Sequence, residues 1–167
     1  AAGVRYMLAV SEELPLSVYV NLPSCVPATH MGTAGASLAA NDLAAMADLP
    51  RVIGLAEIMN VPGAVLGLPN ALEKLKAFQG AVVDGHAPGV DGKWLQAYVG
   101  AGPGSDHECT TPEEMVQKLR LGMVVFVRES TAAKNLRALL PAITPRNSRR
   151  CAFCSDDRHP ADLLDEG

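Results

Sequence analysis

The chain has 167 residues, of which 49% are hydrophobic and 19% are charged, and its formal net charge is −4. This apolar content is enough to form a hydrophobic core and excludes a largely disordered chain. A mildly acidic chain without a basic run is a poor candidate for binding nucleic acid or an anionic membrane surface through its overall charge. No apolar run approaches the roughly 18 residues that a membrane helix needs. We therefore expect one globular domain, or part of a larger one, that binds neither nucleic acid nor a membrane.

The cysteines and the first residues bear on the cellular compartment. Only Cys151 and Cys154 are closely spaced, and four cysteines are too few for a disulfide-stapled secreted fold. The first residues show no secretion signal, and the chain does not start with methionine, so we expect an internal start. The composition indicates a reduced, cytoplasmic protein.

The first half of the chain alternates apolar segments with helical patterns. Asn70 begins an Asn-x-x-Glu capping pattern, which predicts an amphipathic helix that ends at Gly80. The other elements predicted in this half are a strand over 17–20, an Ala-rich helix over 36–47, a strand over 52–58 and a strand over 81–84.

The second half holds the strongest helix signal in the sequence. Thr111, Pro112 and Glu114 offer an N-cap, a proline at the first helical position and a glutamate at the third, and Gly122 ends the helix. The remaining predicted elements are a helix from Asp91 to the Gly-rich stretch 100–104, a strand over 123–127, a helix from Ser130 or Thr131 through Leu140, a strand over 151–154 and a helix over 160–166.

About six apolar strands alternating with about six helices are typical of a parallel sheet covered on its faces. Polar residues sit just after these strands or, for His107, after the Gly-rich stretch, at intervals of 21 to 36 residues: Asn21, Glu57, His86, His107, Arg128 and Asp156. One unit of an eight-fold barrel averages about 30 residues. An open doubly wound sheet also fits, but the Gly-rich phosphate loops typical of it are absent from the sequence. We therefore predict an α/β fold that is a partial (β/α)8 TIM barrel of about six βα units, with its first strands missing.

Four of these polar residues form a candidate metal site: Glu57, His86, His107 and Asp156. The carboxyl ends of barrel strands face a common mouth, where active sites are assembled. Imidazole nitrogen and carboxylate oxygen suit zinc, iron or manganese. Each residue could also have a purely structural role: a loop histidine, a buried paired carboxylate, or an aspartate that caps the last helix.

Several segments together resemble the adenine deaminases of the amidohydrolase superfamily. They are Leu-Pro-Ser-Cys-Val-Pro-Ala at 22–28, Gly-Leu-Ala-Glu at 54–57, Asp-Gly-His-Ala-Pro-Gly at 84–89, Ser-Asp-His-Glu-Cys-Thr-Thr at 105–111, Ser-Arg-Arg-Cys at 148–151 and Ser-Asp-Asp-Arg-His-Pro at 155–160. The resemblance covers nearly the whole chain and keeps the order of the motifs. It implies a (β/α)8 barrel with a two-metal centre of manganese or iron, for which zinc is an alternative. The implied reaction is hydrolytic deamination of adenine, a small-molecule purine, to hypoxanthine and ammonia.

The resemblance also assigns roles to individual residues. Glu57 matches a bridging carboxylate, and His86 and His107 match metal ligands after the next two strands. Asp156 matches an aspartate that ligates metal and accepts the proton of the attacking water, which makes it the candidate catalytic residue. Three further polar residues are candidate substrate-binding residues because of where they fall: Asp84, Glu108 and Arg128.

Two departures from the family limit this hypothesis. The four histidines do not include the His-x-His pair that follows the first strand in the superfamily, and the auxiliary sheet domains are missing. We therefore expect residues 1–167 to be an internal fragment of the catalytic barrel, about strands three to eight, with no second domain and little turnover on its own.

Two alternatives stay open. One is a related amidohydrolase acting on another purine or a cyclic amide, because superfamily membership indicates the metal and the water more firmly than the substrate. The other is a non-catalytic truncated remnant. The open edges of an incomplete barrel favour self-association, so a homo-oligomer is a further expectation.

Overall fold

The computed structural model describes residues 2–166 and shows an α/β fold with two parallel three-stranded sheets. The first sheet has the order β1 (Val20–Pro23), β2 (Val52–Ile58) and β3 (Val82–Gly85). The second has the order β4 (Ser105–Asp106), β5 (Val124–Arg128) and β6 (Cys151–Cys154). All four strand pairings are parallel. The six strands therefore follow one another in chain order.

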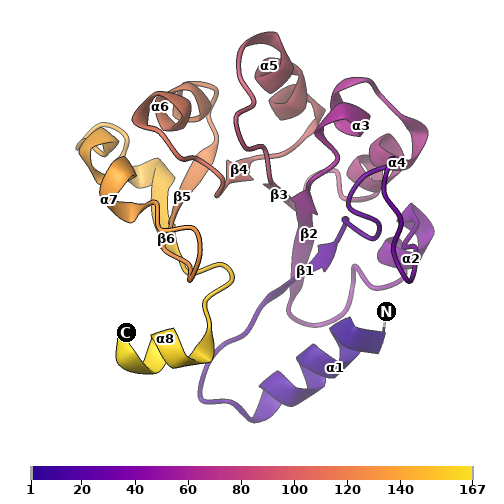
Figure 1. The fold of residues 1–167 in the computed structure, drawn as a ribbon. Coiled ribbons are helices and arrows are strands. Elements are labelled where there is room, and N and C mark those ends of the chain that lie inside the picture. The colour runs from indigo at the N-terminus through magenta and orange to yellow at the C-terminus, as the bar shows by residue number, and fades with distance from the viewer. Residues whose placement is uncertain (1, 167) are drawn as a thin grey trace.

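The two sheets meet at a seam between β3 and β4. The backbone N–H of Gly104 donates to the carbonyl oxygen of Val83 at 2.9 Å. A Cβ at Gly85 would collide with the carbonyl oxygen of Ser105, so the close approach of the two strands requires glycine there. The six strands consequently run along one arc, with helices on its outer side (Figure 1).

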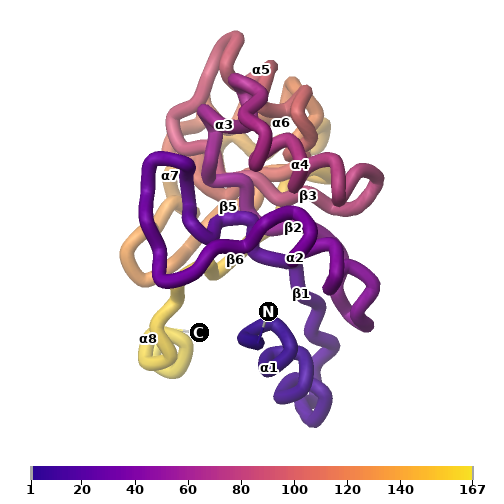
Figure 2. Tube along the Cα trace, turned by 90° about the vertical axis from the view of Figure 1, so that its right-hand side faces the viewer, coloured from indigo at the N-terminus to yellow at the C-terminus, as the bar shows by residue number. Residues whose placement is uncertain are grey.

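Helices connect successive strands and cover the outer side of the arc (Figure 1). They are α2 (Ala40–Ala44), α3 (Val61–Val65), α4 (Pro69–Ala77), α5 (Gly92–Ala101), α6 (Pro112–Arg120) and α7 (Leu136–Leu139). The terminal helices α1 (Ala2–Val10) and α8 (Pro160–Asp165) both lie at the end of the molecule opposite α5 and α6 (Figure 2). Short 3₁₀ turns occur at Ser11–Glu13, Leu140–Ala142 and Ser148–Arg150. Within residues 2–166, no helix has the length and apolar character needed to cross a membrane.

Several predicted elements are confirmed closely. The strand predicted over 52–58 is β2, and the strand predicted over 151–154 is β6. The N-terminus of α6 forms as its sequence predicts: Thr111 Oγ1 accepts the backbone N–H of Glu114 at 3.2 Å, and Pro112 occupies the first turn. Gly122 follows the helix with φ +88°, a conformation that glycine adopts without strain.

Other boundaries differ for local reasons. The predicted strand 17–20 begins only at Val20, and the predicted helix 36–47 is reduced to α2. Asn70 is not the N-cap of α4, because Pro69 already occupies the first turn and Leu68 is the cap. The helix predicted from Ser130 starts only at Leu136, since Ser130 Oγ exchanges hydrogen bonds with the backbone of Ala133 and forms a turn. Helices α1 and α3 were not predicted.

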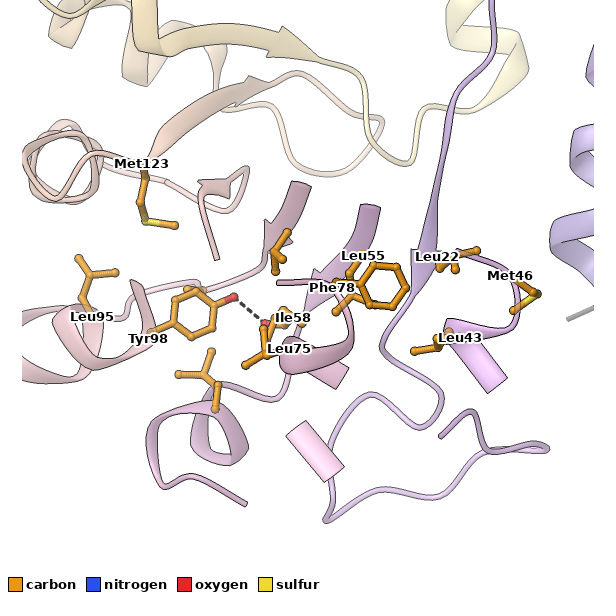
Figure 3. Packing of buried hydrophobic residues seen from close by; sticks show 14 residues of the cluster. Leu22, Leu43, Met46, Leu55, Ile58, Leu75, Phe78, Leu95, Tyr98 and Met123 are labelled. Carbon is orange, nitrogen blue, oxygen red and sulfur yellow. Dashed lines mark hydrogen bonds between the residues drawn. The ribbon is translucent and has the colours of Figure 1, made fainter. Parts of the chain in front are cut away.

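Two apolar cores lie between the strands and the outer helices. The first packs Leu22, Leu55, Phe78 and Tyr98 between the first sheet and its helices (Figure 3). Within it, the Tyr98 hydroxyl donates to the carbonyl oxygen of Ile58 at 2.7 Å, the bond drawn as a dashed line in Figure 3. The second core is smaller and consists of Cys109, Met115, Val125, Val127 and Leu139. The strand side chains that point toward the helices are thus buried.

The opposite strand face is much more open. Ile53 on β2, Val82 on β3 and Phe153 on β6 are 45%, 53% and 69% exposed. Val52 and Val83, next to Ile53 and Val82, pack against the first core. The pairing of β1 with β2 is irregular between Val52 and Gly54, so β2 does not alternate regularly around Ile53. The inner side of the arc is therefore apolar along the strands, and its polar residues gather at their carboxyl ends.

Candidate metal centre

Glu57 connects the two predicted histidine ligands. It is the penultimate residue of β2, and its Oε2 lies 2.9 Å from His86 Nδ1 and 3.0 Å from His107 Nε2. The hydrogen bonds from His107 and His86 lower the pKa of the Glu57 carboxyl to about 2. One ionised oxygen therefore stands between two imidazoles.

The two histidines come from opposite sides of the seam. His86 directly follows β3 and His107 directly follows β4, so each imidazole starts at the carboxyl end of a strand. The backbone N–H of His86 donates to Tyr98 Oη at 3.0 Å, which fixes the start of this loop. The ring centroids are 5.4 Å apart with an interplanar angle of 68°. Burial opposes the charging of His107, but the hydrogen bond and negative charge of Glu57 outweigh it and raise the pKa of His107.

An ion-pair network borders this cluster. Glu108 Oε1 lies 3.5 Å from His107 Nε2 and 3.6 Å from His86 Nδ1. Arg128, at the end of β5, bonds both carboxylate oxygens of Glu108, with Nη2 to Oε2 at 3.1 Å. Its Nη1 also lies 2.7 Å from Asp156 Oδ2. Burial opposes the charge on Arg128, but the bonds to Asp156 and Glu108 outweigh it and raise the pKa of its guanidinium.

The remaining two predicted residues face the same region. Asp156 follows β6 and has φ +50°, a backbone conformation that aspartate tolerates better than most residues. Asp84, within β3, accepts a hydrogen bond from the Ser105 hydroxyl across the seam. Both line an open hollow of about 370 Å³ on the inner side of the arc. The hollow is lined by Ala56, Glu57, Asp84, His107, Phe126, Phe153, Cys154 and Asp156.

Among residues 2–166, two overlapping groups of side chains could hold a cation: Glu57, His86 and His107, and His107, Glu108 and Asp156. In each, the ligand atoms lie within 4.8 Å of one another. The first offers two imidazole nitrogens and a carboxylate oxygen, a donor set that fits zinc, iron or manganese. The carboxylates of the second are already paired with Arg128, so a cation there would compete with the guanidinium. The first group is the better fit.

The remaining two histidines and the two closely spaced cysteines belong to neither group. His30 Nδ1 is 3.1 Å from Asn60 Oδ1, and His159 Nδ1 accepts the backbone N–H of Ala161 at the start of α8. Cys151 and Cys154 are free thiols and belong to neither group of potential ligands. Both histidines therefore have ordinary structural contacts.

The buried polar residues behind the site were not predicted from the sequence. Asp106 and Lys118 are both completely buried, and they form an ion pair beside the two histidine loops. One signal was available, because Lys118 is three residues after Met115 and so lies on the buried face of α6. Nothing in that spacing indicates which carboxylate forms an ion pair with Lys118.

Imidazoles and carboxylates gathered at the carboxyl ends of parallel strands, beside an open hollow, form the kind of site that metal-dependent hydrolases use. Sequence comparison narrows this class. The chain is 53% identical over 167 residues to the adenine deaminase of Desulfatibacillum aliphaticivorans. It is 48% identical over 165 residues to that of Dehalococcoides mccartyi and 52% identical over 166 residues to that of Syntrophobacter fumaroxidans.

Each of these alignments covers 99% of this chain and 29% of the relative. The chain is therefore similar over its whole length to a segment of proteins named adenine deaminase, and it spans about three-tenths of the length of the relatives it matches. A scan against protein-family models found no match.

Proposed function

We propose that these residues form part of an active site that hydrolyses adenine to hypoxanthine and ammonia. The observation that carries the proposal is the contact of Glu57 Oε2 with both His86 and His107, in a chain about half identical to proteins named adenine deaminase. The site acts within a polypeptide longer than these 167 residues, because the matched relatives extend well beyond the aligned segment.

The proposal includes the architecture around the site. Six parallel strands in chain order, with helices on the outer side, support six consecutive units of a (β/α)8 barrel, about strands three to eight. The exposed side chains of Ile53, Val82 and Phe153 face the side that a closed barrel would cover. Residues 1–167 would then be one fragment of that barrel, with no second domain.

Glu57, His86 and His107 would hold a divalent cation, manganese or iron, with zinc also compatible with the donor set. Asp156 is a further ligand if the centre is binuclear, as the family resemblance implies. When bound, the cation lowers the pKa of a water molecule toward neutrality and so supplies the nucleophile. The ionised form of Glu57 is the protonation state that suits this role.

Asp156 would take a proton from the attacking water and deliver one to the departing amino group of adenine. Arg128 Nη1, 2.7 Å from Asp156 Oδ2, fixes this carboxylate at the rim of the hollow. Water adds at C6 of the purine, the C6–N bond breaks, and ammonia leaves.

The hollow has the chemistry to bind a flat heterocycle. Phe126 and Phe153 offer apolar ring surface, and Asp84 offers hydrogen-bond acceptors on the same lining. Glu108 and Arg128 would act from behind the metal ligands, because Arg128 is bonded both to Glu108 and to Asp156. Polar groups matched to one base edge discriminate strongly against purines with another exocyclic group.

The test is ammonia release by the protein as its gene encodes it, with Mn²⁺ or Fe²⁺ and a panel of purines. We expect adenine to be the preferred substrate and Glu57→Gln to lower kcat/KM by at least about 100-fold. The matched control is Glu73→Gln, an exposed carboxylate on α4, which should leave the rate unchanged. Preference for another purine would instead favour the related amidohydrolase, and full activity of Glu57→Gln would contradict the site.

A further inference from the structure

A completely buried ion pair lies directly behind the two histidines. Lys118 on α6 and Asp106 at the end of β4 are both 0% exposed, and Nζ lies 2.8 Å from Asp106 Oδ2. Neither residue lines the hollow, so neither contacts a substrate there. Any effect of this pair on the site must act through its neighbours.

The pair binds the backbone of both histidine loops. Asp106 Oδ1 accepts the N–H of Ala87 at 2.8 Å, and Lys118 Nζ donates to the carbonyl oxygen of Ala87 at 2.7 Å. Asp106 Oδ2 accepts the N–H of Glu108 at 2.9 Å. The third ammonium donor of Lys118 goes to Glu114 Oε1 at 2.8 Å, so all three donors are used.

We propose that Lys118 and Asp106 are positioning residues that set the separation of the His86 and His107 imidazoles. Ala87 directly follows His86, while Asp106 and Glu108 flank His107 on both sides. One ion pair therefore connects a peptide group next to each histidine, across the seam between the two sheets. Any effect of this separation of the two imidazoles on catalysis rests on the proposed function. The separation itself does not depend on that function and can be tested without it.

Stability and positioning can be separated experimentally. Replacing a buried ion pair by apolar residues of similar volume is often neutral or stabilising, whereas removing one partner is strongly destabilising. Apolar side chains cannot bond the N–H and C=O groups of Ala87 or the N–H of Glu108. The double variant Asp106→Leu/Lys118→Met should therefore retain the packing and lose the constraint on the loops.

The first readout uses metal-free protein, as the gene encodes it, labelled with ¹⁵N-histidine. Two ring nitrogens contact Glu57 in the wild type, one from His86 and one from His107. Their ¹⁵N NMR signals are identified as the ones whose chemical shifts change in Glu57→Gln. We expect the double variant to move the same ring shifts toward those of an unbonded histidine. The control is Met115→Ala, which removes a buried side chain of α6 that bonds neither loop and should leave the shifts in place.

Unchanged ring shifts in the double variant would overturn the proposal. If that variant does not fold, Asp106→Asn carries the same test: it preserves the shape of the side chain but replaces one acceptor oxygen with a donor. The N–H of Ala87 or of Glu108 then loses its partner, and we expect the ring shifts to move in the same direction.

The second readout is Co²⁺ binding, with the metal ion alone as the probe. We expect the double variant to bind Co²⁺ roughly 10- to 100-fold more weakly, the usual effect of losing a group that orients metal ligands. Wild-type affinity in the double variant would overturn the positioning role. Wild-type Co²⁺ affinity in Glu57→Gln would instead contradict the proposed metal site. The NMR comparison would then still test the positioning role of Lys118 and Asp106.

Discussion

The two sheets are stabilised by different means. Behind the first, the space between strands and helices is filled by a large apolar core that includes Leu22, Leu55 and Phe78. Behind the second, the apolar core is smaller, and a completely buried lysine and aspartate lie beside it. The first half of the molecule thus depends mainly on packing, and the second also depends on the pairing of charges.

Two buried lysines show the contrast directly. Lys74 on α4 is 5% exposed and its Nζ donates to the carbonyl oxygen of Ser24 at 2.8 Å, so burial lowers its pKa. For Lys118, burial also opposes the charge, but Asp106 outweighs it and raises the pKa. Burial therefore disfavours the charged form of Lys74 in the first half, whereas the contact with Asp106 favours the charged form of Lys118 in the second.

The largest effect is expected from Lys118→Met. This change leaves the Asp106 carboxylate buried without its partner, which costs about 3–5 kcal/mol of unfolding free energy. Chemical denaturation measures the difference. A loss below about 1 kcal/mol would show that charge pairing does not stabilise the second half.

Leu55→Ala tests the packing of the first half. Leu55 is 0% exposed, and its truncation should cost about 3 kcal/mol through lost burial and the cavity left behind. The matched control is Ile53→Ala on the same strand, where the side chain is 45% exposed and faces away from the core. Equal losses in the two variants would contradict the assignment of the buried and open strand faces.

Tyr98→Phe should have an intermediate effect. The hydroxyl donates to Ile58 O and accepts from His86 N–H, so its removal leaves two backbone groups without a partner. We expect a loss of about 1–2 kcal/mol in denaturation, together with faster hydrogen exchange of the His86 amide. Wild-type protection of that amide would show that Tyr98 does not restrain the loop.

Lys74→Met should have the smallest effect, about 1 kcal/mol or less near neutral pH, because only one hydrogen bond to Ser24 O is lost. A loss as large as that of Lys118→Met would remove the contrast between the two lysines.

The pH dependence of these two variants should have opposite signs. The folded chain binds the Lys74 proton more weakly than the unfolded chain, so wild-type stability rises as pH approaches 10.5 and the cost of Lys74→Met grows. For Lys118 the folded pKa is raised, so its stabilisation is complete below 10.5 and is lost as pH rises through the folded value. Denaturation of both variants between neutral and alkaline pH measures the slopes, and slopes of equal sign would contradict the assigned environments.

The sequence predicted the parts of the structure that depend on local signals. β2 is an apolar run interrupted by Gly54 and Glu57, and α6 begins at the cap that Thr111 and Pro112 provide. Glu57, His86 and His107 converge because the carboxyl ends of parallel strands share one edge, which strand–helix alternation already predicts.

What the sequence did not predict depends on long-range contacts. The bonds of Arg128 to Glu108 and Asp156 join three separate loops, and no spacing in the chain indicates them. The burial of Lys118 against Asp106 is of the same kind. The short α7 reflects competition by a serine turn, which helical periodicity alone does not reveal.

Glu57 belongs to the first sheet and His107 follows the first strand of the second, so their contact spans the seam at β3 and β4. An ion held by both would cross-link the halves, and its binding would add to the free energy of unfolding of the whole chain. Metal-loaded protein should then melt in a single transition at a higher temperature. Chelation should allow the charge-paired half to loosen before its neighbour.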